Sequence, residues 1–438
     1  MNRLIKYFLI TTSIITFAGK ALAANKVESG NQYVESDLKI KISAYADFQA
    51  GVPTQSRLKS DEKNVSANRK DFAFYNSAAA VLNISKEVDD ITYGGKIVLV
   101  PTAKKKGAPT YNGSHVYVSS EFGKVEAGSP IDAASTLFVD AGAITAAVDD
   151  WERYTKFDAQ SLSHEGLSPS FASFDEFFLD SKLVTNLENR SYSSEPSRTV
   201  NYYTPKFDLG TATKVQAGIS YTPDSSNTGA DNPDKNSSGV DKRKITKDGS
   251  EFFELDRTVK DAITGGVTVE QNISDGVDFK IGVTGEYGKA AGSAKKKTEE
   301  DGEDKTLAIY KLKDLRSYNI GAVLSIGSFS VAGSYGSLEN SLTTREFHKT
   351  GTDTKYYTGA VAYNQGPFTA SVSYFRSNQF KNTVDTISLG TDYVLAPGFK
   401  PYAVISQYEL KGRPEFFPEV GKRKSRGTVA IIGTKLSL

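Results

Sequence analysis

Few side chains in this sequence could do covalent chemistry or bind a metal. The 438 residues include no cysteine and three histidines, His115, His164 and His348, and no two of these have the spacing of metal ligands. His164 lies near Ser161 and Ser163, but neighbours in sequence seldom form a catalytic triad. We therefore predict no enzymatic activity, no metal site and no cofactor.

The chemistry that remains is electrostatic, and one long segment concentrates acidic residues. Residues 130–197 contain no clear strand, and compact domains rarely tolerate such a length outside functional loops. Asp149, Asp150 and Glu152 cluster around Trp151, whose ring can pin the segment. Residues 133–147 carry a weak helical pattern, so a short helix is expected there.

Charge and the N-terminal pattern limit the class of protein. The 53 basic residues nearly balance the 52 acidic ones, so the basic excess typical of nucleic-acid binding is missing and no nucleic-acid partner is predicted. Arg3 and Lys6 precede an apolar run over residues 7–17 and the tripeptide Ala21-Leu22-Ala23. This order is typical of a secretory signal peptide, which we assign to residues 1–23.

The mature region alternates apolar and polar residues with a period of two, which predicts strands. After residue 23 no run approaches the ~18 consecutive apolar residues of a membrane-spanning helix. We predict sixteen strands in an all-β chain. They are expected near 38–50, 71–85, 91–102, 113–122, 124–129, 198–207, 213–222, 259–273, 276–288, 312–326, 328–336, 355–364, 367–376, 383–395, 399–409 and 426–438.

The connections between these strands are short and long in turn. Lys86–Asp90 and Ser274–Gly276 are examples of the short set, and 51–70 and 223–258 are examples of the long, charged set. An outer-membrane β-barrel sorts its connections in this way because one rim faces the periplasm and the other faces the exterior. A soluble β-sandwich gives no reason for the sorting.

The two rows of each predicted strand differ in polarity, as lipid and water would require. In 38–50 the apolar row begins with Leu38 and Ile40, while Lys39 and Lys41 stand on the other row. Lys96 shares this second, inward parity on its own strand. In a barrel the apolar row faces lipid and the polar row faces a water-filled interior.

Three segments resemble the general Gram-negative outer-membrane porin family. Residues 117–128 (YVSSEFGKVEAG) are similar to the strand, Phe-Gly turn and strand that lead into the family's third loop. Residues 197–221 resemble a strand, a Tyr-x-x-Pro-x-Phe turn and the strand that follows. The third match is the terminal strand, residues 426–438, where Leu438 stands in place of the family's usual phenylalanine.

The resemblance implies a transmembrane antiparallel β-barrel of 16 strands, assembled as a homotrimer in the outer membrane of a Gram-negative bacterium. It implies that 24–438 form the barrel, that 130–197 fold inward as a constriction loop, and that small hydrophilic solutes and ions diffuse through the channel. Outer-membrane lipid and lipopolysaccharide would surround it. Carboxylates facing lysines across a narrow pore would create a transverse field.

Within that scheme we assign Asp149, Asp150 and Glu152 to the acidic side of the constriction. The basic wall is assigned to the lysines of the inward rows, which are Lys39, Lys41 and Lys96. The family's basic residue after the fifth strand is replaced here by Ser129 and Pro130, so it is not carried over.

Two other functions remain open from the sequence alone. A barrel could act mainly as an adhesin or antigen through its external loops, without conducting. A soluble exported lectin-like β-protein is the third interpretation, and recovery from the periplasm without detergent would favour it.

Overall fold

The computed structural model describes ten segments of the chain. They are residues 38–55, 72–100, 110–146, 197–227, 240–244, 251–300, 303–344, 354–379, 382–411 and 424–438. Lys39–Leu438 form one compact unit, and of the other unit, Met1–Leu38, only Leu38 is described. The signal peptide predicted over residues 1–23 therefore lies outside the described residues and stays a prediction.

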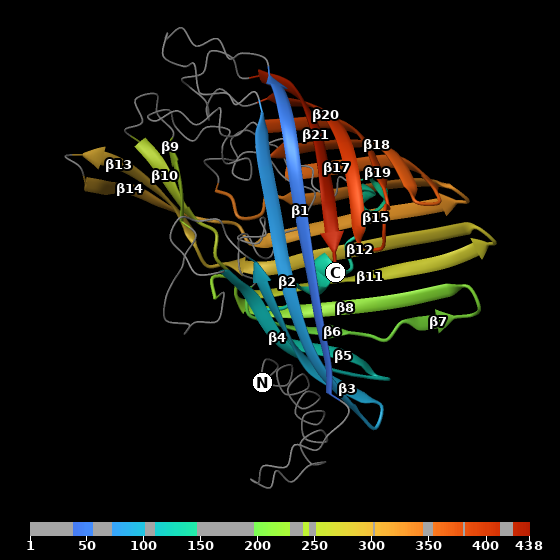
Figure 1. Ribbon diagram of the computed structural model, residues 1–438. Coiled ribbons are helices and arrows are strands. Elements are labelled where there is room, and N and C mark those ends of the chain that lie inside the picture. The colour runs from blue at the N-terminus through green and yellow to red at the C-terminus, as the bar shows by residue number, and fades with distance from the viewer. Residues whose placement is uncertain are drawn as a thin grey trace. The chain divides into compact units, whose positions relative to one another are not determined.

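The chain forms a closed antiparallel β-barrel of sixteen wall strands (Figure 1). Its first half comprises β1 Leu38–Gln55, β2 Ala73–Val88, β3 Ile91–Val100, β4 Thr110–Ser120, β5 Gly123–Gly128, β6 Thr199–Tyr203 with β7 Phe207–Leu209, β8 Thr213–Asp224 and β11 Val259–Ser274. Its second half comprises β12 Val277–Ala290, β15 Leu315–Ile326, β16 Phe329–Glu339, β17 Thr354–Gln365, β18 Phe368–Gln379, β19 Asn382–Tyr393, β20 Phe399–Lys411 and β21 Lys424–Ser437. Each strand pairs with the next, and β1 closes the ring by pairing with both β2 and β21.

The predicted antiparallel barrel and all sixteen predicted strands are confirmed, with one local difference. The strand expected at 198–207 is interrupted, because β6 ends at Tyr203 and β7 begins at Phe207, and both pair with β8. Pro205 lies in the gap, and a proline cannot donate to a strand ladder. β6 and β7 are therefore two parts of one wall strand. Residues 147–196 of the predicted inward loop lie outside the described residues, so the inward fold of the whole loop stays a prediction.

The tight turns lie together at one end of the barrel (Figure 1). Between β2 and β3, Asp89 and Asp90 have φ values of 48° and 63°. Two successive residues with positive φ are typical of a type I′ hairpin turn, whose twist matches that of the flanking strands. The wall strands are thus joined with little chain at this end, as their sequence spacing predicted.

A second sheet of four strands was not predicted. β9 Val240–Lys244 and β10 Glu251–Asp256 lie in the connection from β8 to β11, and β13 Ser293–Glu300 and β14 Glu303–Lys311 lie in the connection from β12 to β15. Their order is β14-β13-β10-β9, and they pair only with one another. Both connections were predicted to be long, and none of the sixteen predicted strands lies in them.

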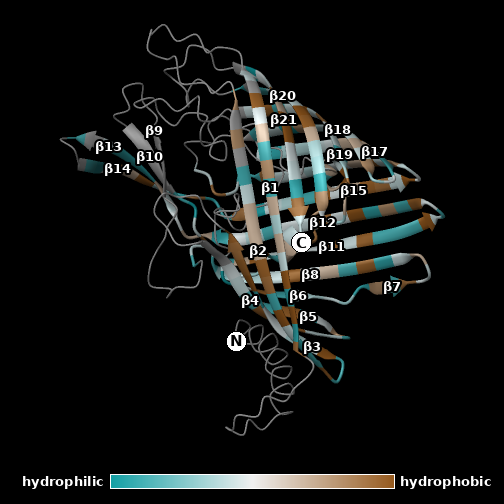
Figure 2. Cartoon of the chain, in the orientation of Figure 1, coloured by the Kyte–Doolittle hydropathy of each residue, from teal (hydrophilic) through white to brown (hydrophobic). Residues whose placement is uncertain are grey.

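Outward and inward rows differ along the wall strands as the alternation predicts (Figure 2). On β17, Tyr357 and Val361 are exposed on the outward row, whereas Tyr356, Thr358 and Ala360 on the inward row are buried. A strand with a lipid-facing row and an interior row has this pattern. No helix among the described residues is long and apolar enough to cross a membrane.

Aromatic residues form two girdles on the outward face, as interfacial side chains do in outer-membrane barrels. The girdle nearer the long connections includes six tyrosines, which are Tyr221, Tyr287, Tyr318, Tyr335, Tyr357 and Tyr374. Tyr335 links two of its neighbours, with ring centroids 6.0 Å from Tyr318 and 5.1 Å from Tyr357. The girdle nearer the tight turns includes Phe329 and Tyr363, whose ring centroids are 5.0 Å apart.

The two girdles define the depth at which a charge is costly. We expect Val361→Arg, on the outward row between Tyr357 and Tyr363, to lower the free energy of unfolding by about 2–4 kcal/mol. Gln365→Arg lies on the same row beyond Tyr363, and we expect it to cost at most about 1 kcal/mol. Denaturant unfolding in lipid vesicles measures both. Equal costs would show that Val361 does not face the hydrocarbon.

Candidate functional site: the inner wall of the barrel

The loop that follows β5 lies against the inner wall in its described part. Residues 129–146 contain α2 Ala133–Thr136 and the 3₁₀ turn η1 Ala141–Ile144, so the single helix expected over 133–147 is two short turns. Backbone N–H groups of this segment donate to wall hydroxyls on three strands. The bonds are Ala133 to Ser220 Oγ on β8 (2.7 Å), Ala141 to Thr358 Oγ1 on β17 (3.1 Å) and Ala146 to Ser371 Oγ on β18 (2.7 Å). The segment therefore crosses the wall from β8 to β18.

The first residues of the segment are fixed most firmly. Asp132 caps α2 by accepting from the Ser135 N–H (3.0 Å), and its Oδ1 also accepts from Thr264 Oγ1 on β11 (3.2 Å). Asn201 on β6 donates to the Ile131 carbonyl oxygen (2.7 Å). Buried polar groups left without partners would each cost about 1–3 kcal/mol, so these bonds hold the loop to the wall.

Glycines on the inward rows make room for the segment. A Cβ added to Gly282 on β12 would lie 2.6 Å from Val139 Cγ2, and one added to Gly321 on β15 would overlap the Val139 carbonyl oxygen. That oxygen accepts from Asn319 Nδ2 (3.2 Å). The wall is therefore shaped for close approach of this backbone, which is a common reason for glycine inside a strand.

A group of charged and polar side chains lies on the inward rows of β3 to β6, and we call it the β3–β6 cluster. Lys96 faces His115 across the β3–β4 pair, and His115 Nε2 lies 3.8 Å from Glu126 Oε1 on β5. Lys124 forms an ion pair with Glu126, whose Oε2 accepts from Asn201 Nδ2 (3.1 Å). Asn201 thus connects the cluster to the start of the loop.

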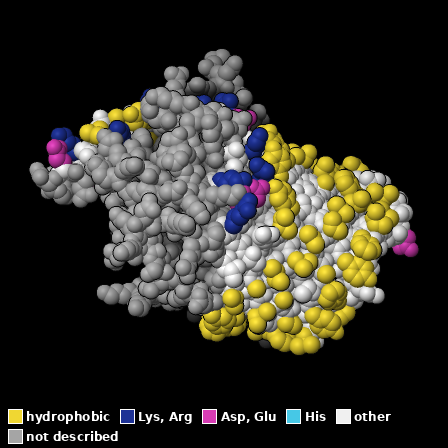
Figure 3. Space-filling model, turned by 90° about the horizontal axis from the view of Figure 1, so that it is seen from above, with side chains coloured by type: hydrophobic (Ala, Val, Ile, Leu, Met, Phe, Trp, Pro, Cys, Tyr) yellow, Lys and Arg dark blue, Asp and Glu magenta, His cyan; other side chains and the backbone are white. Residues whose placement is uncertain are grey.

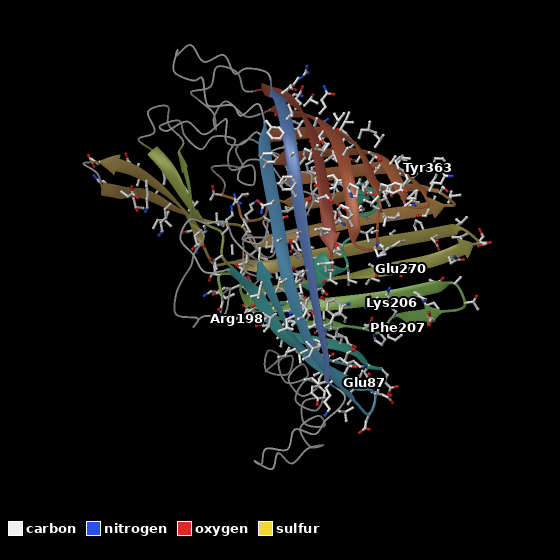
Figure 4. The ribbon with its side chains drawn as sticks, viewed as in Figure 1. Glu87, Arg198, Lys206, Phe207, Glu270 and Tyr363 are labelled. Atoms are coloured by element: carbon white, nitrogen blue, oxygen red, sulfur yellow. The ribbon has the colours of Figure 1, made fainter. Side chains whose placement is uncertain are left out.

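More charge pairs lie on the inner wall toward the tight turns. Glu270 on β11 is 3.1 Å from both Lys206 and Lys280, and Asp392 on β19 is 3.2 Å from Lys400 on β20. Figure 4 shows Lys206 and Glu270 near the tight-turn end. Exposed ion pairs contribute about 0–1 kcal/mol. These ion pairs therefore affect the local electric field more than the free energy of unfolding.

The structure places the three predicted lysines in three different settings. Lys96 belongs to the β3–β6 cluster, whereas Lys39 pairs with Glu87 (3.0 Å) near the tight turn between β2 and β3. Lys41 is exposed on β1. The role of all three as a basic pore wall stays a prediction.

The predicted acidic residues Asp149, Asp150 and Glu152 lie outside the described residues, as does Trp151. Their place in the constriction likewise stays a prediction. In the segments that the structure describes, no three His, Cys, Asp or Glu side chains are grouped so that they could hold a metal ion.

Sequence reasoning missed Lys124, Glu126 and Asn201 as a connected group. Their alternation on β5 and β6 was a usable signal, because it gives all three the inward parity. The inward glycines Gly282 and Gly321 were a second signal, since a wall of water-facing side chains has no need for them.

The chain matches the family model described as Gram-negative porin over residues 11–413. The chain belongs to the Gram-negative porin family. It is 41% identical over 445 residues to an uncharacterized protein of Rickettsia felis, covering 98% of this chain and 99% of that one. It is 40% identical over 446 residues to a Rickettsia prowazekii protein, also uncharacterized, with the same coverage.

Among solved structures, an anion-selective porin from Comamonas acidovorans has the same fold. Its TM-score is 0.51 at 13% identity, and the match covers 92% of this chain and 100% of that one. Family and fold together make this porin a multi-pass β-barrel of the Gram-negative outer membrane, with the architecture of a channel.

Because this porin has no cysteine, a designed disulfide can test the contact between loop and wall. We expect Ala146→Cys with Ser371→Cys to form a disulfide on mild oxidation, since these residues are joined by a 2.7 Å hydrogen bond. Free-thiol titration and peptide mass spectrometry measure it. The control pair, Ala146→Cys with Ser220→Cys, should stay reduced because Ser220 contacts the other end of the segment. Equal oxidation of both pairs would contradict the path described here.

Proposed function

We propose that this porin forms a water-filled channel through which small hydrophilic solutes and ions diffuse passively. The observation that carries the proposal is the solvent exposure of lysine side chains on the inward rows. The side chains of Lys124 and Lys280 are 41% and 44% exposed although both stand on inward rows. Burying an ammonium group without water or a full set of partners would cost several kcal/mol. The exposure of these two lysines is therefore consistent with a barrel interior filled with water.

The size of the barrel supports the same function. Eight-stranded barrels fill their interior with side chains, whereas barrels of sixteen to eighteen strands leave an aqueous channel. The described part of the loop occupies one side of the wall, from β8 to β18. The β3–β6 cluster lies on other strands, and the pairs of Glu270 lie on β11 and β12 closer to the tight turns, so both remain charged lining for the channel.

We further propose that Asp149, Asp150 and Glu152 supply the acidic side of the constriction and that inward lysines, Lys96 among them, supply the basic side. The wall position of Ala146, three residues before Asp149, supports an inward start for this acidic stretch. Charges of opposite sign across a narrow pore bias the passage of ions and orient dipolar solutes.

Conductance in planar bilayers under a salt gradient tests the channel and its charges. We expect steady ohmic current. We expect the reversal potential to shift toward the equilibrium potential of the anion in the triple variant Asp149→Asn, Asp150→Asn and Glu152→Gln. The reason is that a narrow pore with fewer fixed negative charges admits cations less readily.

The matched control removes three carboxylates from the small sheet, with Glu300→Gln, Glu303→Gln and Asp304→Asn. We expect this control to leave the reversal potential unchanged, because β13 and β14 have no partner in the barrel wall. Absence of any current from folded wild-type protein would refute the channel and favour the surface-adhesin function. A current with no shift would remove the three acids from the constriction.

We propose that the porin is a homotrimer. Membership of the family supports this, and so does the position of the six girdle tyrosines, all of which lie on strands from β8 to β18. On β1 and β2 the outward row includes small residues such as Ala44, Ala46 and Ala80, which allow close contact with a neighbour.

The mass of the native complex tests the assembly. Light scattering in detergent should give three times the protomer mass after the detergent contribution is subtracted. Ala46→Arg should reduce that mass to one protomer, whereas Val372→Arg, on the outward row of β18, should keep the trimer. A monomeric wild type would refute the proposal.

A further inference from the structure

His115 is the one histidine among the residues that the structure describes, since His164 and His348 lie outside them. It lies in the middle of β4, directly opposite Lys96 on β3 and Gly128 on β5. Figure 1 shows these three strands side by side in the wall. The outward surface seen in Figure 3 is apolar across its middle, whereas the imidazole of His115 lies on the inward row, beside the charged groups of the interior.

The segment 129–146 leaves the wall at the level of His115. Gly128, the last residue of β5, has a φ of 132°. A Cβ added there would lie 2.5 Å from the Ser114 carbonyl oxygen and 2.8 Å from His115 Cα. The next residue, Ser129, donates its N–H to the same carbonyl oxygen (2.7 Å). The imidazole therefore stands at the depth where the loop enters the barrel.

Within the described residues, three charged side chains act on the imidazole, one from β3 and two from β5. Glu126 Oε1 lies 3.8 Å from His115 Nε2, and Lys124 forms an ion pair with the same carboxylate. Lys96 faces His115 across the β3–β4 pair. The carboxylate favours the protonated ring, whereas burial and the two lysines favour the neutral ring. Histidine is the side chain whose charge ordinarily changes between about pH 5 and 8.

One proton on His115 changes the charge of the β3–β6 cluster strongly. Two lysines and one carboxylate give the cluster a net charge of +1, and an imidazolium raises this charge to +2. The side chains of His115 and Glu126 are only 10% and 9% exposed, so salt screens their charges less than it screens exposed groups. Lys124 is 41% exposed and reaches the water of the interior. The added charge therefore acts on ions that pass this part of the wall.

We propose that His115 is a further residue that determines ion selectivity, because its protonated ring adds a positive charge at the depth where the loop enters the barrel. A wall with more fixed positive charge favours anions over cations. The channel is therefore more selective for anions at about pH 5 than at about pH 8. This inference rests on the proposed function, since ion selectivity is a property of a conducting channel.

Reversal potentials in planar bilayers, measured in a fixed potassium chloride gradient from pH 8 to pH 5, test the proposal. On acidification the ratio of anion to cation permeability should rise about twofold more in the wild type than in His115→Gln. Pore carboxylates take up protons in both proteins, so the difference between the two isolates the imidazole. The double variant His164→Gln with His348→Gln is the matched control and should keep the pH dependence of the wild type. Heat-dependent gel mobility confirms that each barrel is folded.

His115→Lys places a permanent positive charge at the same position. At pH 8 its anion preference should exceed that of the wild type, and the part of the pH dependence that His115→Gln removes should be missing. A defect in folding would not produce this gain at pH 8.

The midpoint of the pH dependence separates a charge effect from a structural one. Lys96→Gln removes a cation that opposes protonation of the ring, so the midpoint should move to higher pH. Nuclear magnetic resonance of histidine-labelled protein in detergent micelles follows the same titration without any need for conduction, and the signal missing from His115→Gln identifies the ring.

The outcomes distinguish this inference from the proposed function. A steady current with equal pH dependence in the wild type and His115→Gln would overturn the role of His115 and leave the channel intact. An imidazole that stays neutral down to pH 5 would overturn it as well. Absence of current from folded wild type would instead refute the channel itself.

Discussion

A backbone that crosses lipid has no water to bond with, so every strand needs a partner on both edges. β1 is the strand on which this condition depends, because it pairs with β21 from Tyr45–Ser437 to Gln55–Gly427 and with β2 on its other edge. Leu438 continues the ladder by exchanging two backbone hydrogen bonds with Ala44. Once the ring is closed, each wall residue faces either lipid or interior. The girdles and the inner lining both follow from that division.

The inner wall meets two different demands in different places. Where it faces water, inward lysines pair with carboxylates, as Lys280 does with Glu270, and keep much of their side chains exposed. Where the loop lies against it, hydroxyls such as Ser220 and Ser371 accept the loop's N–H groups. Each unpaired buried N–H would cost about 1–3 kcal/mol, so a wall without these hydroxyls would not hold the segment. The same barrel therefore serves as channel lining and as the support for its own loop.

The strands were predictable because lipid imposes a period of two on the residues that it touches, and the row Leu38, Ile40 and Ile42 shows it directly. The small sheet was not predictable, because charged runs such as Lys295–Glu300 resemble a solvated loop. They form a strand only by pairing with β10 and β14. The inward orientation of Lys96 could be predicted from the alternation within its own strand. Its neighbours His115, Lys124 and Glu126 come from two further strands, and which residues meet depends on register that no single strand encodes.

Register decides what a charged residue does in this barrel. On β12, Lys280 faces inward to Glu270 and Lys289 faces outward to Asp261, because an odd number of positions separates them. A bulge between Lys260 and Ile263 on β11 sets the second contact, and Asp261 within it has a φ of 49°. A non-glycine residue in that region costs of order 1–3 kcal/mol. The contacts of Asp261 with Lys289 and with the Tyr221 hydroxyl (3.0 Å) offset part of that cost. A slip of one residue in the register would turn Lys280 outward and Lys289 inward. The register of this strand pair therefore fixes both the inner wall and the outward face.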